Sequence, residues 1–195
     1  MKNINKKLLE AVRLNEIEEV RKLIEEGADV NVVCEYKRTA LYWASFWGCS
    51  DVVKILIEAG ANVNVVDVDG RTALHLASYH GYSEIVKILI EAGADLNAVV
   101  CENGATALHF GSYQGHSEIV KMLIEGGADV NAVDEHGRTA LYRASRRGYS
   151  EIVKMLIEKG ANVNVVNKYG ATALHSASYK GHSEIMKMLE EAGAK

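Results

Sequence analysis

A glycine followed by alanine returns along the whole chain at a nearly fixed stride, and this stride constrains the fold more than any other feature. These glycines are Gly27, Gly60, Gly93, Gly127, Gly160 and Gly193. The steps between them are 33, 33, 34, 33 and 33 residues. A Thr-Ala-Leu triplet keeps the same rhythm from Thr39 to Thr172. The single extra residue is therefore expected in a loop within residues 98–103. Such self-similarity predicts an array of stacked repeats.

Each repeat contains two short helical patterns. In the third copy, the first helix is expected from Thr72 to about His80, and the second from Ser83 to about Ala92. We expect Ser83 to cap the second helix, because a serine oxygen can accept a hydrogen bond from a free N–H group of the first turn. Gly93 should end that helix in the left-handed conformation that glycine adopts without strain. The unit is therefore a helix, a turn, a second helix and a projecting hairpin.

This unit resembles the ankyrin repeat, whose core reads G-x-T-P-L-H-x-A-A, then G-H-x-E-I-V, then G-A-D-V-N. Residues 104–109, 115–120 and 127–131 match these three parts almost letter for letter. The resemblance covers about residues 4–195 and implies an all-α solenoid of stacked helix-turn-helix units with projecting β-hairpin loops. We expect a single domain of about six repeats. They are an N-terminal cap at 4–36, full repeats at 37–69, 70–103, 104–136 and 137–169, and a C-terminal cap at 170–195.

The sequence departs from the family pattern at two turns and at both ends. The proline of T-P-L-H is alanine in every copy, which should keep the helix because alanine favours helices. Lys37 stands where the other full repeats have glycine, so a hairpin tip that requires positive φ is expected to be distorted. Glu190 replaces the Ile157-type residue, and Glu19 and Lys22 replace isoleucines in the first copy. Both ends are therefore expected to be polar caps.

Composition excludes several classes of protein. No apolar run approaches the ~20 residues of a membrane span, and the first residues lack the apolar stretch of a secretion signal. We expect an intracellular protein of the cytoplasm or nucleus that is not secreted and binds no membrane.

The net charge of −4 disfavours general affinity for nucleic acid. The three cysteines show no C-x-x-C spacing, so neither a disulfide framework nor a zinc site is indicated.

No motif of a catalytic, metal or cofactor site occurs in the chain. Five of the seven histidines recur at repeat positions, and the family resemblance implies that they brace loops and inter-helix turns. These are His75, His109, His116, His175 and His182. Ser78 and His75 share a helix face, but they lack an orienting acid and separate oxyanion donors. The repeated asparagines, of which Asn64 is one, are interpreted as loop braces. We predict that the protein is not an enzyme and has no catalytic residue, metal ligand or cofactor.

Comparison of the copies with one another isolates the columns that change, and these are the candidate partner-binding positions. A spacing of i, i+3 and i+4 puts several of them on one face of the first helix. The family resemblance implies that this face and the hairpin tips line a concave groove. The helix positions are Trp43, Phe46, Trp47, Tyr79, His80, Phe110, Tyr113, Gln114, Arg143, Arg146, Arg147, Tyr179 and Lys180. The hairpin positions are Tyr36, Arg38, Asp69, Arg71, Asn103, His136, Arg138 and Tyr169.

The expected groove changes character along the chain. Its first part is rich in large aromatic residues of the kind enriched at interface hot spots. Its later part is basic: residues 137–169 carry seven basic and two acidic residues, a net charge of +5. Residues 104–136, with one lysine against five acids, sum to −4. Two simpler interpretations stay open, namely aromatic side chains that pack against neighbouring helices and a solvated basic face.

The favoured hypothesis is a non-catalytic protein–protein interaction module, monomeric, that binds a protein or peptide with apolar and acidic segments. One alternative is a groove for a nucleotide or oligonucleotide, with bases stacked on the aromatics and phosphates on the arginines. Another is an engineered or idealised ankyrin scaffold without a natural partner, since residues 6–11 look like the N-terminal cap of designed ankyrin proteins. The three cysteines and the irregular 34-residue repeat argue against pure consensus design. Both origins stay open.

Overall fold

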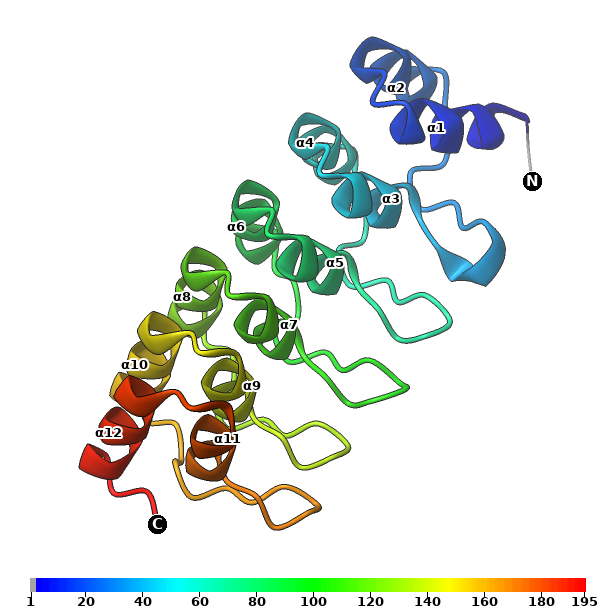
Figure 1. Ribbon diagram of the computed structural model, residues 1–195. Coiled ribbons are helices and arrows are strands. Elements are labelled where there is room, and N and C mark those ends of the chain that lie inside the picture. Colours follow the sequence, from blue (N-terminus) through cyan, green and yellow to red (C-terminus); the bar gives the residue numbers. More distant parts are fainter. Residues whose placement is uncertain (1–2) are drawn as a thin grey trace. The chain divides into compact units, whose positions relative to one another are not determined.

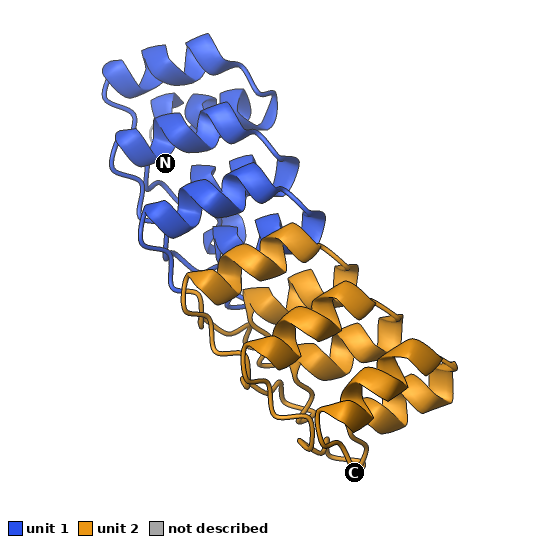
Figure 2. Ribbon diagram, turned by 90° about the vertical axis from the view of Figure 1, so that its left-hand side faces the viewer, with its two compact units in different colours: residues 1–95 blue, residues 96–195 orange. Residues whose placement is uncertain are grey.

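The structure is a computed structural model that describes residues 3–195, and in that range the chain is a series of short helices in pairs (Figure 1). It divides into two compact units, of which unit 1 ends at Asp95 and unit 2 begins at Leu96 (Figure 2). Within residues 3–195 no helix is long and apolar enough to cross a membrane. The expectation of an all-helical repeat architecture is confirmed.

Unit 1 contains three helix pairs. Their helices are α1 (Asn3–Arg13) and α2 (Ile17–Glu25), α3 (Ala40–Trp47) and α4 (Ser50–Glu58), and α5 (Ala73–His80) and α6 (Ser83–Glu91). The first helices α1, α3 and α5 contact one another in sequence and form one row, and α2, α4 and α6 form a second row (Figure 1). A short 3₁₀ turn, η1 (Glu35–Lys37), lies at the tip of the first hairpin.

Unit 2 repeats this two-row arrangement. Its helices are α7 (Ala107–Gln114) and α8 (Ser117–Glu125), α9 (Ala140–Arg147) and α10 (Ser150–Glu158), and α11 (Ala173–Lys180) and α12 (Ser183–Glu191). Helix α9 contacts both α7 and α11, and α10 contacts both α8 and α12. Hairpins without regular strands project from the first-helix row (Figure 1). The core lies between the rows, where leucine, isoleucine and valine side chains such as Leu108, Ile119 and Leu156 are almost fully buried.

The first helices begin as their sequences predict. Apart from α1, each starts at the alanine that replaces the family's proline, one residue after a threonine at the cap position. In α5 the His75 N–H donates to Oγ1 of Thr72 at 3.4 Å, and the Thr72 N–H donates to Nδ1 of His75 at 3.1 Å. This capping box satisfies two backbone donors that the end of the helix would otherwise leave free. The helix therefore keeps a well-defined start without proline.

The prediction that Ser83 and its equivalents cap the second helices is wrong. Ser83 is the first helical residue, and Tyr82 occupies the cap position without a side-chain cap bond. The reason lies in the preceding turn: the Val86 N–H already donates to the Tyr82 carbonyl oxygen at 3.0 Å, so the helical bonds start one residue earlier than expected. The same shift applies to Ser50, Ser117, Ser150 and Ser183. The predicted left-handed glycine after each second helix is confirmed, with φ of 82° at Gly93.

The hairpins confirm three other expectations. Lys37 has φ of 57° where Gly70 has 78°, and the tip there is the 3₁₀ turn, so this hairpin differs as predicted. The extra residue lies in the third hairpin, where the Val100 N–H donates to the carbonyl oxygen of Ala105. The repeated asparagines brace the loops: Asn64 donates from Nδ2 to the Gly93 carbonyl oxygen at 3.3 Å and accepts from the Asp95 N–H at 2.8 Å.

The predicted end caps carry polar side chains at the positions that differ from the internal copies. Lys22 and Glu190 are exposed, and Glu19 is half-buried. The Lys22 ammonium lies 3.4 Å from the Glu19 carboxylate. Polar side chains therefore stand where the internal second helices carry isoleucine, valine or methionine.

Aromatic rings brace neighbouring repeats by packing on the glycine of the preceding inter-helix turn. An added Cβ at Gly115 would lie 2.6 Å from the ring of Tyr149, and one at Gly148 would lie 2.7 Å from the ring of His182. His182 also makes a 3.3 Å hydrogen bond from Nε2 to the carbonyl oxygen of Arg146. The bracing role predicted for this column is therefore confirmed in unit 2.

Gly115→Ala is expected to lower the free energy of unfolding by about 3 kcal/mol, because the new methyl group requires both a strained backbone and displacement of the Tyr149 ring. Gly127→Ala is the matched control, since Gly127 has φ of 96° but open space around the Cβ position. It should cost only about 1 kcal/mol for the backbone. Equilibrium urea unfolding of the two variants measures the difference, and equal losses would contradict the close packing of the ring.

Candidate functional site

The first-helix face of unit 1 carries a cluster of rings in mutual contact, here called the aromatic cluster: Trp43, Phe46, Trp47, Tyr79 and His80. The Phe46 ring lies 6.0 Å from that of Trp43, 4.8 Å from that of Trp47 and 5.1 Å from that of His80, each in an edge-to-face arrangement. Tyr79 meets His80 at 5.1 Å in the same way. Edge-to-face pairs are a favourable geometry for aromatic rings. The cluster therefore joins α3 to α5 as an ordered surface.

Members of the aromatic cluster differ in how much they face solvent. Trp47 is 51% exposed and Tyr79 is 42% exposed. Trp43 and Phe46 are half-buried. The simpler interpretation, packing between helices, thus describes much of Trp43 and Phe46, whereas Trp47 and Tyr79 leave about half of their surface open for contact with another molecule.

Arg38 is held over three rings beside this cluster. Its guanidinium carbon lies 5.2 Å from the ring centre of Tyr36, 5.1 Å from that of Tyr42 and 5.4 Å from that of Trp43. Its Nε lies 3.5 Å from Oδ2 of the buried Asp67. Arg38 therefore orders the tip of the first hairpin, where Tyr36 remains 60% exposed.

The next hairpin carries a pair of predicted contact residues that meet each other. The guanidinium of Arg71 lies 3.4 Å from the carboxylate of Asp69, and both side chains are about one-third exposed. An exposed pair of this kind contributes little to stability. It leaves the tip of this hairpin close to neutral.

A hollow between α1 and α3 lies next to the aromatic cluster. It has a volume of about 440 Å³ and is lined by Lys6, Leu9, Glu10, Arg13, Cys34 and Trp43. A smaller one of about 160 Å³ is lined by Glu10, Arg13, Leu14 and Trp47. The predicted site did not include these α1 residues. The first copy differs so much from the other copies that its residues could not be aligned with their variable positions. The helical spacing of Lys6, Leu9 and Arg13 was the signal that could have found them.

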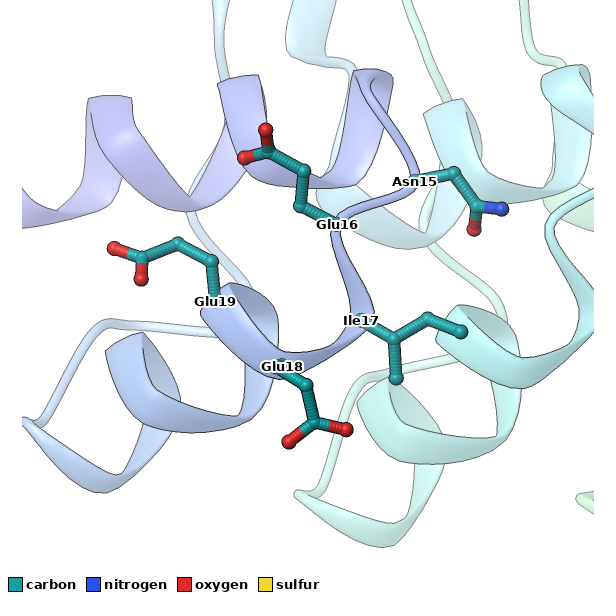
Figure 3. A pocket seen from close by; sticks show the side chains of 5 residues that line it. All are labelled: Asn15, Glu16, Ile17, Glu18 and Glu19. Atoms are coloured by element: carbon teal, nitrogen blue, oxygen red, sulfur yellow. The ribbon is translucent and has the colours of Figure 1, made fainter.

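Another hollow, of about 560 Å³, lies at the turn between α1 and α2 and is lined by Asn15, Glu16, Ile17, Glu18 and Glu19. Figure 3 shows that the three carboxylates point in different directions. No group of three or more potential ligands that could hold a metal ion occurs in residues 3–195. This acidic turn therefore has no arrangement for coordination.

In unit 2 the central feature is the buried carboxylate of Asp134. Its Oδ2 accepts hydrogen bonds from Nε of Arg138 and Nη2 of Arg143, each at 2.8 Å. Its Oδ1 accepts from the backbone N–H groups of His136 at 2.8 Å and Arg138 at 2.9 Å. Burial by itself would raise the pKa of Asp134, but these bonds outweigh it and the pKa is lowered. The carboxylate therefore stays charged and holds the hairpin together.

Arg143 does not lie where the sequence analysis placed it, on an open basic face. Its side chain is only 11% exposed and pairs with Asp134. The buried anion one turn before α9 draws the guanidinium inward, because a charge in the protein interior needs an opposite charge close by. Arg138 is held by the same carboxylate and is about one-third exposed. Arg143 therefore contributes to the structure rather than to an exposed cationic surface.

His109 contacts the same hairpin from α7. Its Nδ1 accepts from the Thr106 N–H at 3.2 Å, so Nε2 carries the proton and donates to the Arg138 carbonyl oxygen at 2.9 Å. Burial, helped by the charge of Arg143, lowers the pKa of His109 to about 4. His109 is therefore a neutral structural residue, and its local bonds confirm the role that the family resemblance implied.

The exposed cations on the first helices of unit 2 form a small set, here called the basic patch: Arg146, Arg147 and Lys180. Arg146 and Arg147 are exposed at the end of α9, and Lys180 is exposed at the end of α11. The Arg147 guanidinium lies 4.2 Å from the ring centre of Tyr113, and its Nε donates to the Tyr113 carbonyl oxygen at 3.2 Å. Lys180 lies 5.5 Å from the ring centre of Tyr179. The stacking holds two of the three cations beside exposed aromatic rings.

The remaining predicted positions of unit 2 vary in exposure. Tyr169 and His136 are exposed at hairpin tips, whereas Phe110 and Gln114 are half-buried on α7. Asn103 is half-buried and accepts a hydrogen bond from the Ala105 N–H at 3.0 Å, so its side chain holds the third hairpin. Tyr169 and His136 therefore offer contact surface, whereas Asn103 serves the loop.

A row of valines at the base of the hairpins escaped the sequence analysis. One valine of each hairpin is between 44% and 57% exposed. They are Val33, Val66, Val99, Val133 and Val166. This column is constant among the copies, so a comparison for changing positions does not single it out. Its position just before the variable hairpin tips was the available signal.

Comparison with known proteins agrees with the geometry. A family model described as ankyrin repeats, in three copies, matches residues 5–67, 60–134, 97–167 and 128–195. A search of curated proteins found no match. The matched segments cover nearly the whole chain and repeat the helix pairs, threonine caps and asparagine braces described above. The chain belongs to the ankyrin-repeat family.

Proposed function

We propose that this chain is a non-catalytic interaction module that holds a protein or peptide through its first-helix faces and hairpin tips. Ankyrin repeats are generally protein–protein interaction modules, and the family is typically non-catalytic. In this proposal the aromatic cluster of unit 1 takes an apolar part of the partner, and the basic patch of unit 2 takes an acidic part.

One observation carries the proposal: the most exposed aromatic side chains occur in only two kinds of place. Trp47, Tyr79, Tyr113 and Tyr179 lie in the last turn of a first helix, and Tyr36 and Tyr169 lie at hairpin tips. Exposed aromatics with ordered neighbours are enriched at the centres of protein interfaces. Their restriction to these two places supports a contact surface there, because scattered exposure would show no such preference.

The arrangement favours a protein partner over a nucleotide. One face of the Tyr113 ring already carries the Arg147 guanidinium, so that face is not open for a base. The two cations of Arg138 and Arg143 are held by Asp134, which leaves fewer charges for phosphates than the sequence count suggested. Binding of labelled single-stranded DNA over a range of salt concentrations tests this, since phosphate binding weakens steeply with salt.

Affinity capture of cellular proteins followed by mass spectrometry tests the proposal directly. We expect the wild-type chain to retain a defined partner, and Trp47→Ala and Arg146→Glu each to weaken its capture by about tenfold or more, the loss of one interface anchor. Lys154→Glu is the matched control for Arg146→Glu, because Lys154 is exposed on α10, in the second row of helices.

Circular dichroism establishes that the variants remain folded. Unchanged capture by both Trp47→Ala and Arg146→Glu would remove the first-helix faces from the proposal. A loss as large for Lys154→Glu would show that general charge, and not the basic patch, governs binding.

A further inference from the structure

The two hollows between α1 and α3 form a single feature, here called the α1–α3 groove. Both are lined by Glu10 and Arg13, and they are closed on the α3 side by Trp43 and Trp47. Helices α1 and α3 contact each other within unit 1, so the two walls belong to the same compact body. The larger hollow, of about 440 Å³, falls within the size of pockets that hold small ligands or side chains, roughly 300–1,000 Å³.

The lining of the α1–α3 groove is apolar where the two helices meet. Leu9 is buried at 8% exposure and Trp43 is half-buried, and together they line the larger hollow. At the other end Leu14 is 62% exposed and Trp47 is 51% exposed. Large apolar side chains this exposed gain free energy when another apolar group covers them. The groove therefore suits a bulky apolar side chain.

The rim of the groove carries charges in the order positive, negative, positive. Lys6, Glu10 and Arg13 follow one another at intervals of four and three residues, which places them on one face of α1. Within residues 3–195 none of the three has an oppositely charged group within 4 Å, so all three are open to another molecule. On the α3 side the Arg38 guanidinium lies over Trp43 but is already paired with Asp67, so the free charges of the rim are those of α1. The rim is thus complementary to two carboxylates with a neutral residue between them.

The spacing of the two rim cations sets the spacing of those carboxylates. Lys6 and Arg13 are seven residues apart in a helix, which at about 1.5 Å per residue separates them by roughly 10 Å along the axis. A peptide in the extended polyproline II conformation covers that distance in about three residues at about 3.1 Å each, and its side chains three positions apart lie on the same side. Glu10 lies between the two cations and repels an acid at the centre of the segment.

From this we infer that the α1–α3 groove binds an extended peptide segment in which a bulky apolar residue stands between two acidic residues about three positions apart. The apolar side chain enters between Leu9 and the two tryptophans, and the carboxylates meet Lys6 and Arg13. The inference rests on the proposed function, because it names the chemistry of a partner segment for one part of that surface.

The chain supplies its own probe of this groove. It contains only two tryptophans, and both line the groove. Intrinsic tryptophan fluorescence therefore reports occupancy directly, since an apolar side chain that displaces water from the rings shifts their emission to shorter wavelength. No knowledge of the natural partner is needed.

Selection from a displayed library of random peptides on the wild-type chain is the experiment. We expect enriched peptides to carry an apolar residue between two acids, to shift the tryptophan emission, and to bind Arg13→Glu at least about tenfold more weakly. Arg21→Glu is the matched control, because Arg21 is an exposed arginine on α2, which does not line the groove. Binding to Arg21→Glu should stay within about twofold of wild type.

The outcomes separate this inference from the proposed function. Enriched peptides that leave the tryptophan emission unchanged, or that bind Arg13→Glu as well as wild type, overturn the groove assignment while the interaction module stands. Enrichment of peptides without acids overturns the charge argument. If no peptide is enriched and affinity capture also retains no partner, the proposed function falls together with the inference.

Discussion

Asp134→Asn is expected to lower the free energy of unfolding by about 3 kcal/mol, although the substitution changes one oxygen to a nitrogen. Asn167 occupies the same position in the next repeat, where its Oδ1 accepts from the Tyr169 and Ala171 N–H groups at 2.9 and 3.0 Å. An asparagine at position 134 can therefore hold the hairpin backbone in the same way. The substitution does remove the negative charge that compensates the guanidinium of Arg143, whose side chain is only 11% exposed.

A second substitution tests whether the lost charge is the cause. Leu76 stands at the Arg143 position in an earlier repeat and is buried there at 7% exposure. Arg143→Leu in the Asp134→Asn background removes the uncompensated cation, and we expect it to recover most of the lost stability. Replacing a buried ion pair by apolar residues is often close to neutral. The Nε of Arg143 already lacks a hydrogen-bond partner in its buried position, which lowers the cost of losing this side chain.

Equilibrium urea unfolding followed by circular dichroism measures both variants near neutral pH. If Asp134→Asn unfolds at the same urea concentration as wild type, the ion pair does not stabilise the hairpin. A double variant that is less stable than Asp134→Asn would instead show that Arg143 contributes through packing of its stem.

Acidification from pH 6.5 to 4 is expected to remove about 3 kcal/mol of stability through His109 alone. The pKa of His109 is about 4 in the folded chain, against 6.5 for an unperturbed histidine. Unfolding therefore takes up a proton between these two values. This contribution to stability is complete above pH 6.5 and is lost as the pH falls toward 4.

His109→Tyr isolates this effect from the protonation of carboxylates. Tyr42 and Tyr142 occupy the same repeat position, and the backbone N–H of each donates to the threonine cap at 3.1 Å, so the chain already tolerates tyrosine there. Urea unfolding at a series of pH values should show the variant losing about 3 kcal/mol less than wild type between pH 6.5 and 4. Identical pH profiles for the two proteins would mean that His109 is not held neutral by its surroundings.

The helix pairs could be predicted almost to the residue, because their boundaries are encoded locally. A threonine cap, a glycine with positive φ and apolar residues at helical spacing all act within about one turn of the helix end. The serine cap failed for a reason of the same local kind. The turn at Gly81 and Tyr82 starts the helical bonds at the Tyr82 carbonyl oxygen, which leaves Ser83 inside the helix.

The candidate site could be predicted only in part, because exposure depends on residues in neighbouring repeats. The column that contains Trp43, Leu76 and Arg143 varies among the copies and was assigned to the surface, yet Leu76 is buried and Arg143 is nearly so. The side chains at this position vary because each copy fills the same partly buried space beside its first helix with a different residue. The valine column, in contrast, is constant and exposed.

The amino-acid sequence was sufficient for the period, the helix pairs, the loop braces and the family, since each depends on contacts within one repeat or on a pattern that five copies share. The tertiary structure decided which side chains face solvent and which charges are already compensated. Asp134 holds two arginines that the sequence counted as free, and α1 becomes the wall of a groove when it packs on α3. The arginines lie four and nine residues from Asp134, and α3 lies about one repeat from α1. Such outcomes depend on how the hairpins and neighbouring helices fold onto one another, because side chains then fill the same space or neutralise the same charge.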